Sequence, residues 1–189
     1  YHTVTAELGD CRVRVVSSPF PELPGYYLIA PADAAPMVWR RIVEAGGRPI
    51  GTEAYDAARI RCGVPVHGRE MGEEYNPLEA GLTGSIDFAK GCYIGQEVVA
   101  RLNAYDKVQR HLVSLTWSGD ATLPSGSTLS ADGQSVGVVT SSSSDDASRS
   151  HVALALVRRS HSDTGTALAA DVDGGAIEVV VARSSEDRD

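Results

Sequence analysis

The 189 residues are enough for one large or two small domains, and a hydrophobic content of 42% is sufficient for a packed core. A formal net charge of −8 argues against a nucleic-acid partner, because phosphate groups are bound by basic surfaces. No apolar run approaches the roughly 20 residues of a membrane-spanning helix, so no membrane partner is expected.

The first third of the chain predicts a small sheet followed by two helices. Strands are expected at residues 1–8, 12–18 and 26–29; in the second, charged and apolar side chains alternate with the period of a half-buried strand. Helices are expected over residues 33–46, with Asp33 as N-cap, and over 52–62, each closed by glycine. Strands and helices mixed in this way favour an α+β fold.

The middle of the chain predicts a long ordered loop and then a helix. Residues 63–89 are rich in glycine and proline and show little periodicity. Three acidic residues of this loop, Glu70, Glu73 and Glu74, are expected on its solvated face. Apolar residues then recur at helical spacing over residues 94–105.

The remaining residues predict an all-β domain. Six short strands separated by turn signals favour a small barrel or a sandwich. The strands are expected at residues 111–117, 127–130, 135–140, 151–158, 166–170 and 176–182. Residues 141–150 are polar and repetitive and predict a mobile loop. Residues 184–189 predict a frayed tail.

The segment with the clearest chemical signal is residues 90–97, Lys-Gly-Cys-Tyr-Ile-Gly-Gln-Glu. Its two glycines permit a sharp turn with unusual backbone angles, and a helix is expected to begin near Gly95. Cys92 then lies just before a helix N-terminus and beside Lys90. Both features favour a thiolate, which can act as a nucleophile, a metal ligand or a redox sensor. The alternative is a buried Cys92 that packs as a small hydrophobe.

The octapeptide resembles the signature of YgfZ-type proteins, a group of folate-binding proteins related to the aminomethyltransferase of the glycine cleavage system, the T-protein. Four further segments agree with this resemblance, which covers nearly the whole chain. They are a helix exit at residues 59–65, a loop at 77–82 and two strands at 138–141 and 153–157.

The resemblance implies an α+β fold in which the C-terminal part of a folate-binding aminomethyltransferase-like domain precedes a small antiparallel β-barrel. The implied divisions are residues 1–84, a signature loop and helix at 85–106, and the barrel at 107–189. The resemblance also implies tetrahydrofolate as cofactor. Since the chain begins inside a predicted strand, we expect a missing N-terminal region to bind part of that cofactor.

The resemblance also assigns roles to individual residues. Cys92 is the reactive residue and Lys90 its catalytic neighbour. T-proteins carry a folate-contacting Glu and Arg at positions that hold Tyr27 and Tyr55 here, and a phenol cannot replace the charge-assisted bonds of a carboxylate. This departure favours the YgfZ-type branch; both tyrosines can instead stack on a pterin or belong to the core. The residues expected to shape the folate site are Tyr27, Tyr55, Gly91, Gly95, Gln96 and Glu97.

Three hypotheses for function remain. They differ in whether the chain is an enzyme. The first is a tetrahydrofolate-dependent, YgfZ-type protein that supports the maturation or repair of iron–sulfur enzymes, which are then its partners. The second is an aminomethyltransferase that passes a one-carbon unit to tetrahydrofolate, with catalysis mainly by positioning of two substrates. The third is a non-catalytic module whose β domain docks a partner.

The cysteines and histidines give weaker signals. Five histidines and three cysteines have no paired metal-ligand spacing, so no metal site is expected. Cys11 and Cys62 are expected to be buried and inert. The odd, widely spaced cysteines favour a reducing compartment, and we expect a cytoplasmic protein.

Overall fold

The computed structural model describes residues 2–18, 23–105, 107–145, 150–173 and 175–188. The chain divides into two compact units, Tyr1–Ala58 and Arg59–Asp189, and each is described by itself. The divisions predicted after residues 84 and 106 come from the family resemblance and not from compactness. They stay a prediction.

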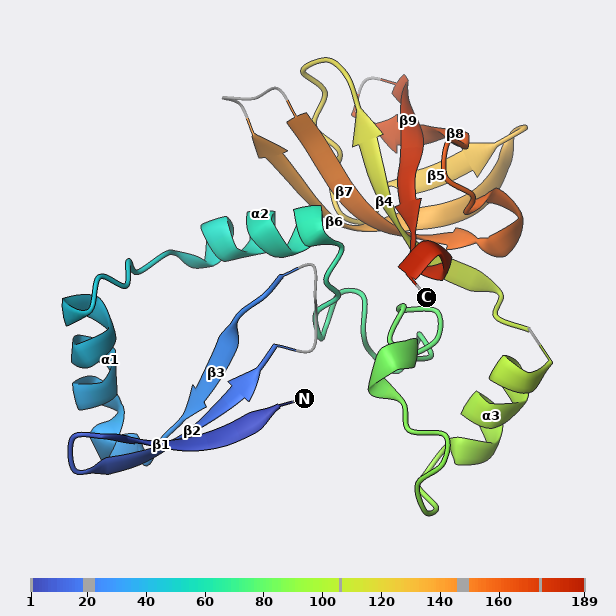
Figure 1. Ribbon diagram of the computed structural model, residues 1–189. Helices are drawn as coiled ribbons and strands as arrows, with labels where there is room; N and C mark the ends of the chain where they lie inside the picture. The colour runs from blue at the N-terminus through green and yellow to red at the C-terminus, as the bar shows by residue number, and fades with distance from the viewer. Residues whose placement is uncertain (1, 19–22, 106, 146–149, 174, 189) are drawn as a thin grey trace. The chain divides into compact units, whose positions relative to one another are not determined.

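The first unit contains a three-stranded antiparallel sheet and helices (Figure 1). Strands β1 (Thr3–Leu8), β2 (Cys11–Ser17) and β3 (Tyr26–Ile29) pair in that order. After a 3-10 turn η1 (Ala32–Ala34), helix α1 (Ala35–Glu44) follows, and α2 (Thr52–Cys62) runs across the boundary between the units. These elements lie within a few residues of their predicted positions.

A small core holds α1 against one face of this sheet. Cys11 and Val13 of β2 pack against Val38 of α1, whereas Ile42 and Val43 of the same helix are exposed. Asp33 lies inside the 3-10 turn and makes no capping bond, so the predicted N-cap is wrong. The opposite face of the sheet carries the exposed Arg12 and Arg14 of β2.

The second unit is built on a closed six-stranded antiparallel barrel, which selects the barrel over the sandwich (Figure 1). The strands follow the order β4-β7-β6-β5-β8-β9 around it. Their bounds are β4 (Arg110–Trp117), β5 (Thr128–Ala131), β6 (Gln134–Asp145), β7 (Ser150–Arg158), β8 (Ala167–Val172) and β9 (Gly175–Ser184). Before the barrel come η2 (Thr83–Ser85) and helix α3 (Gln96–Ala104), and η3 (Arg159–His161) follows β7.

Strand β7 is buried on both faces, which explains its unbroken apolar sequence. Ala153 and Ala155 point into the barrel core, whereas Leu154 and Leu156 pack outside it with Ile60 of α2. Gly137 of β6 allows the two strands to approach closely, because a Cβ at that position would lie 2.6 Å from the carbonyl oxygen of Leu156.

Two predictions at the ends of the barrel strands are wrong. Residues 141–145 belong to β6 and pair with β7, so the expected mobile loop is a strand there; residues 146–149 lie outside the described residues. The expected frayed tail continues β9 to Ser184 and then forms a 3-10 turn η4 (Ser185–Arg188). Hydrogen bonds from the Thr164 hydroxyl and the Ser184 N–H hold the pKa of the Asp187 carboxyl below its ordinary value.

A buried ion pair joins the end of α2 to the loop after it and to the barrel. Arg59 Nη1 lies 3.0 Å from Glu70 Oε2, and neither side chain is exposed. Arg59 Nη2 donates to Ser141 of β6 at 2.8 Å, the Ser141 hydroxyl donates to Glu70, and the Val66 N–H donates to Glu70 at 3.0 Å. The solvated position expected for Glu70 is therefore wrong, whereas Glu73 and Glu74 are exposed.

Candidate functional site

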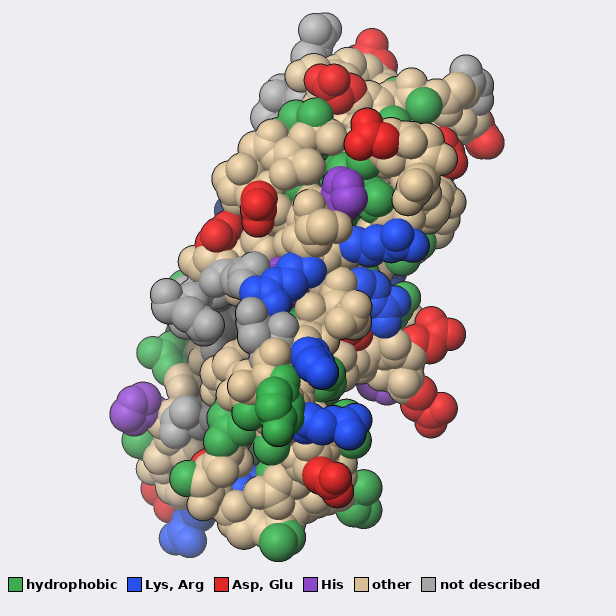
Figure 2. Space-filling view, turned by 90° about the vertical axis from the view of Figure 1, so that its right-hand side faces the viewer, with side chains coloured by type: hydrophobic (Ala, Val, Ile, Leu, Met, Phe, Trp, Pro, Cys, Tyr) green, Lys and Arg blue, Asp and Glu red, His purple; other side chains and the backbone are tan. Residues whose placement is uncertain are grey.

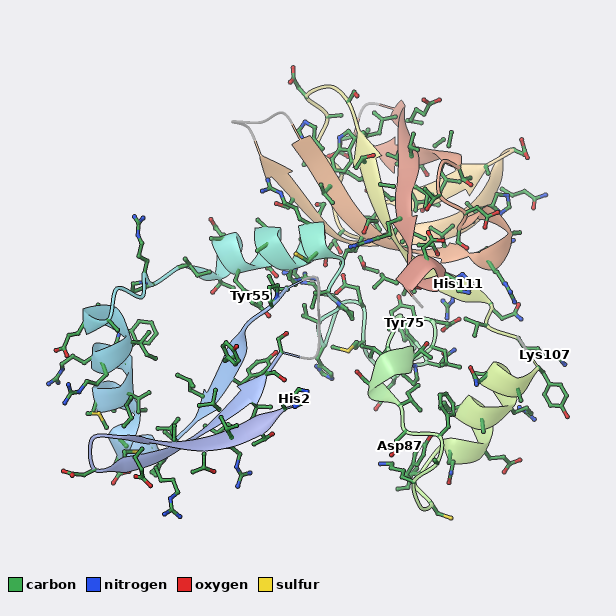
Figure 3. All side chains as sticks on the ribbon, in the orientation of Figure 1. His2, Tyr55, Tyr75, Asp87, Lys107 and His111 are labelled. Carbon is green, nitrogen blue, oxygen red and sulfur yellow. The ribbon has the colours of Figure 1, made fainter. Side chains whose placement is uncertain are left out.

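The signature segment, residues 90–97, forms a turn that precedes α3. Asp87, labelled in Figure 3, stabilises the backbone just before it. Its Oδ1 accepts hydrogen bonds from the N–H groups of Ala89 at 2.9 Å and Lys90 at 3.0 Å. A carboxylate that binds backbone N–H groups two and three residues on is a common way to stabilise a turn. The Asp87 carboxylate thereby holds the backbone that enters the signature turn.

Gly95 connects this turn to α3. Its φ of +87° lies in the left-handed region, and its carbonyl accepts the Val99 N–H at 3.1 Å, which starts the helix at Gln96. A side chain at position 95 would meet no atom within 4 Å, so the backbone angle rather than space requires glycine there. The predicted helix start near Gly95 is confirmed.

Cys92 is a free, exposed cysteine on this turn. The alternative of a buried, packed Cys92 is excluded, and the thiol precedes a helix N-terminus. The chemical role of Cys92 stays a prediction.

The neighbours of Cys92 are arranged within the same turn. Lys90 Nζ lies 5.0 Å from the centroid of the Tyr93 ring, in a cation–π contact that keeps its charge in the turn. Gly91 and Glu97 are exposed, and Gln96 is half-buried. These predicted site residues therefore share one local structure with Cys92.

Tyr27 and Tyr55 lie in the first unit and the signature segment in the second, so each set is described within its own unit. Tyr27 is opposite Val16 in the β2–β3 register, and so faces away from the α1 side, where Val15 packs. It is 52% exposed, and Tyr55, which projects from α2 in Figure 3, is 45% exposed. Neither tyrosine belongs to a core, so both rings are free to contact a ligand.

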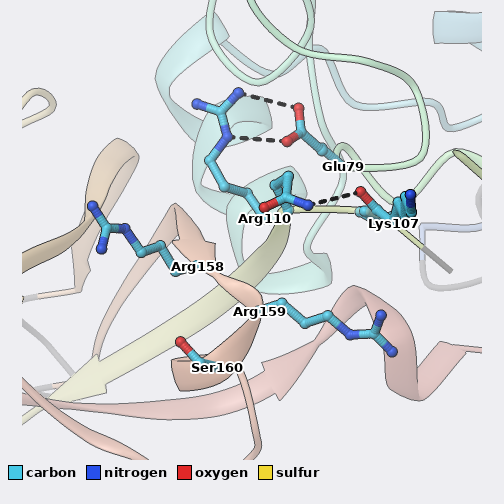
Figure 4. Close-up of a pocket in the computed structure, with 8 residues that line it drawn as sticks. Glu79, Lys107, Arg110, Arg158, Arg159 and Ser160 are labelled. Carbon is cyan, nitrogen blue, oxygen red and sulfur yellow. Dashed lines mark hydrogen bonds and ion pairs between the residues drawn. The ribbon is translucent and has the colours of Figure 1, made fainter. Parts of the chain in front are cut away.

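An open pocket of about 960 Å³ lies in the second unit, and the sequence alone did not predict it. Figure 4 shows residues that line it. They are Glu79, Lys107, Val108, Gln109, Arg110, Arg158, Arg159 and Ser160. Four of the eight are cationic and one is acidic, so the lining is basic in a chain whose net charge is −8. Figure 2 likewise shows Lys and Arg side chains gathered on part of the displayed face.

A two-pronged ion pair forms one wall of this pocket. Arg110 Nε lies 3.0 Å from Glu79 Oε1, and Arg110 Nη2 lies 3.2 Å from Oε2 (Figure 4). The Glu79 carbonyl also accepts the Leu112 N–H at 2.9 Å. The loop at residues 77–82 is thus fastened to β4 through both the side chain and the backbone of Glu79.

We expect Cys92 to be the first cysteine alkylated in the folded protein. It is exposed, whereas Cys11 is buried and Cys62 is half-buried, so the prediction that Cys62 is buried holds only in part. Because access limits alkylation, brief iodoacetamide treatment is expected to label Cys92 at least about ten times faster than Cys11, as measured by peptide mass spectrometry. In denaturant the difference should shrink greatly; comparable labelling of both cysteines in the native protein would contradict the exposed turn.

Metal-binding clusters and membrane-spanning helices are both absent from the described part of the chain. Among the described residues, no three His, Cys, Asp or Glu side chains are grouped so that they could hold a metal ion. Within the same described ranges, each helix is too short or too polar to cross a lipid bilayer.

Comparison with protein families gives two matches that share one family. The model described as the GCVT N-terminal domain matches residues 1–90. The model described as the glycine cleavage T-protein C-terminal barrel domain matches residues 110–185, which contain the whole described barrel.

Individual relatives agree with these matches. A chloroplastic protein of Arabidopsis thaliana, named as a candidate transferase, is 35% identical over 82% of this chain and 36% of its own length. An aminomethyltransferase of Cutibacterium acnes is 31% identical over 96% of this chain and 49% of its own length. The chain therefore spans about half or less of the length of these two curated relatives.

A solved structure matches the fold. The glycine cleavage system aminomethyltransferase T of Bartonella henselae aligns with a TM-score of 0.77 and 20% identity, over 90% of this chain and 48% of that chain. The predicted α+β region followed by an antiparallel barrel is therefore confirmed. At this identity the likeness concerns the fold alone.

Proposed function

We propose, from the premise that this chain belongs to the glycine cleavage T-protein superfamily, that it is part of a tetrahydrofolate-dependent protein of the YgfZ type. In this proposal the protein supports the maturation or repair of iron–sulfur enzymes in the cytoplasm. Cys92 is its working thiol, and those enzymes are its partners.

The observation that carries the proposal is the exposed Cys92 on a glycine-hinged turn. The turn presents the sulfur to solvent shortly before α3, which begins at Gln96. Lys90 adds a positive charge to the same turn. A thiol displayed in this way can exchange or transfer a group with a large partner, which a buried thiol cannot do.

The proposed folate contacts of this chain come from Tyr27 and Tyr55. Both rings are about half exposed, and Tyr27 lies on the sheet face that α1 leaves open. An aromatic face suits a flat pterin, and a phenol offers one hydrogen-bonding group where a carboxylate would offer charge-assisted bonds. We propose that stacking replaces the charged contacts that the resemblance implies for T-proteins.

Complementation tests this function. The whole protein is expressed in a bacterial host that lacks its own YgfZ-type protein. We expect it to restore the specific activity of the affected iron–sulfur enzymes. A folded, expressed protein that restores none of this activity would overturn the proposal.

The second candidate, an aminomethyltransferase, is favoured by the name of the Cutibacterium acnes relative. It requires the whole protein to transfer the one-carbon unit of an aminomethyl-lipoyl carrier protein to tetrahydrofolate, which gives methylenetetrahydrofolate and releases ammonia and the dihydrolipoyl carrier protein. Turnover in that assay, without rescue of iron–sulfur enzymes, would select this candidate. Rescue without turnover would select the first.

A further inference from the structure

The basic pocket of the second unit contains a cross-strand pair of like charges. In the β4–β7 register Arg110 lies directly opposite Arg158. Two like charges opposite one another in an antiparallel pair destabilise the sheet unless an anion lies between or beside them. Glu79 supplies such an anion for Arg110 alone.

The Glu79 carboxylate is already engaged by Arg110 and by the backbone. Its two oxygens accept from Arg110, and Oε2 also accepts the Asn76 N–H at 3.3 Å. The carboxylate is only 4% exposed, so it is fixed beside Arg110. Figure 4 shows Arg158 and Arg159 apart from this pair.

Arg158 is the cation that most lacks a counter-charge. It is exposed, and within the described ranges its side chain makes no hydrogen bond or ion pair. Lys107 lines the same pocket, so the charges of Arg158 and Lys107 remain after the Glu79–Arg110 pair is set aside. The carboxyl end of β7 and the segment entering β4 thus gather positive charge in one place.

We propose that this pocket binds a small oxyanion with two or more negative charges, through Arg158 together with Lys107. A guanidinium binds carboxylate or phosphate oxygens through two parallel hydrogen bonds, and an ammonium adds a point charge. The volume of about 960 Å³ is within the range of small-molecule sites. This proposal does not depend on the proposed function.

Two classes of small molecule carry this charge, polycarboxylates and phosphates. Calorimetric titration distinguishes them. The 189-residue chain is titrated at low ionic strength with citrate, tri-γ-glutamate, pyrophosphate and, as a monovalent control, acetate. We expect saturable one-to-one binding of at least one multivalent anion, no saturation with acetate, and weakening as salt is added. The tightest anion identifies the source.

Two matched variants decide whether the pocket is responsible. Arg158→Gln is expected to weaken binding by about tenfold or more, whereas Arg14→Gln, which removes a likewise exposed charge from β2, should change it less than about twofold. If Arg158→Gln lowers the midpoint temperature of thermal unfolding, the binding test is repeated with Lys107→Gln in its place, with the same expected loss of binding. The proposal would be overturned if Arg14→Gln weakened anion binding as much as Arg158→Gln does. It would also be overturned if the chain bound an acidic protein but none of the small anions.

Discussion

Replacing Arg59 with methionine is expected to lower the free energy of unfolding by about 3–5 kcal/mol, because it leaves the Glu70 carboxylate buried without its counter-charge. The charge of Glu70 has no access to water, and only Ser141 and the Val66 N–H would remain as donors. The variant also removes the hydrogen bonds by which the guanidinium joins α2 to the loop and to β6. Urea denaturation followed by circular dichroism measures the change.

The double variant Arg59→Met/Glu70→Leu separates the ion pair from simple packing. Removing both charges removes the desolvation cost, so we expect the double variant to recover much of the lost stability. If the free energies of unfolding of Arg59→Met and of the unmodified chain differed by less than about 1 kcal/mol, that result would contradict the burial of this pair.

Changing Cys92 to serine is expected to abolish rescue of iron–sulfur enzymes by the whole protein. Serine matches the size of cysteine, but its hydroxyl is not ionised near neutral pH and is a poor nucleophile without a base. Because Cys92 is exposed, the substitution should change the free energy of unfolding by no more than about 0.5 kcal/mol. Loss of rescue with unchanged stability therefore assigns the thiol a chemical role.

Cys62→Ser is the matched control for this variant. Cys62 is half-buried at the end of α2 and has no place in the signature segment. We expect it to retain rescue. Full rescue by Cys92→Ser would remove the thiol from the mechanism, and loss of rescue by both variants would point to folding instead.

Alternation and turn signals predicted most of the secondary structure. β3 begins and ends at its predicted residues, and α2 begins at Thr52 as expected. The polar segment after Thr140 was not predictable as a strand, because its serines resemble a linker. In the barrel these residues are held by ladder pairing with β7, which depends on the backbone and not on side-chain polarity.

The local backbone conformation of the signature segment was also predictable, because it depends on neighbours in sequence. Gly95 takes the left-handed conformation that ends the turn, and α3 follows it. The burial of Glu70 was not predictable in this way. Its side-chain partners, Arg59 and Ser141, lie 11 and 71 residues away in sequence. An acidic residue in a glycine-rich loop also carries no periodic signal.

The basic pocket escaped prediction for the same reason. Lys107 and Arg110 lie at the start of the barrel, and Arg158 and Arg159 lie at the end of its fourth strand along the chain. Only the β4–β7 register brings the two groups together. Pairing the predicted strands by register, and then searching for like charges opposite one another, is a signal that would have found it.

The most direct test of the central claim is calorimetric titration of the whole protein with tetrahydrofolate, beside its Tyr27→Ala variant. We expect saturable one-to-one binding, weakened by about tenfold when the ring of Tyr27 is removed, since stacking of one aromatic ring contributes about 1 kcal/mol or more. Absence of binding by the folded whole protein would contradict a folate-dependent function. Equal binding by both proteins would contradict the assignment of Tyr27 to the pterin.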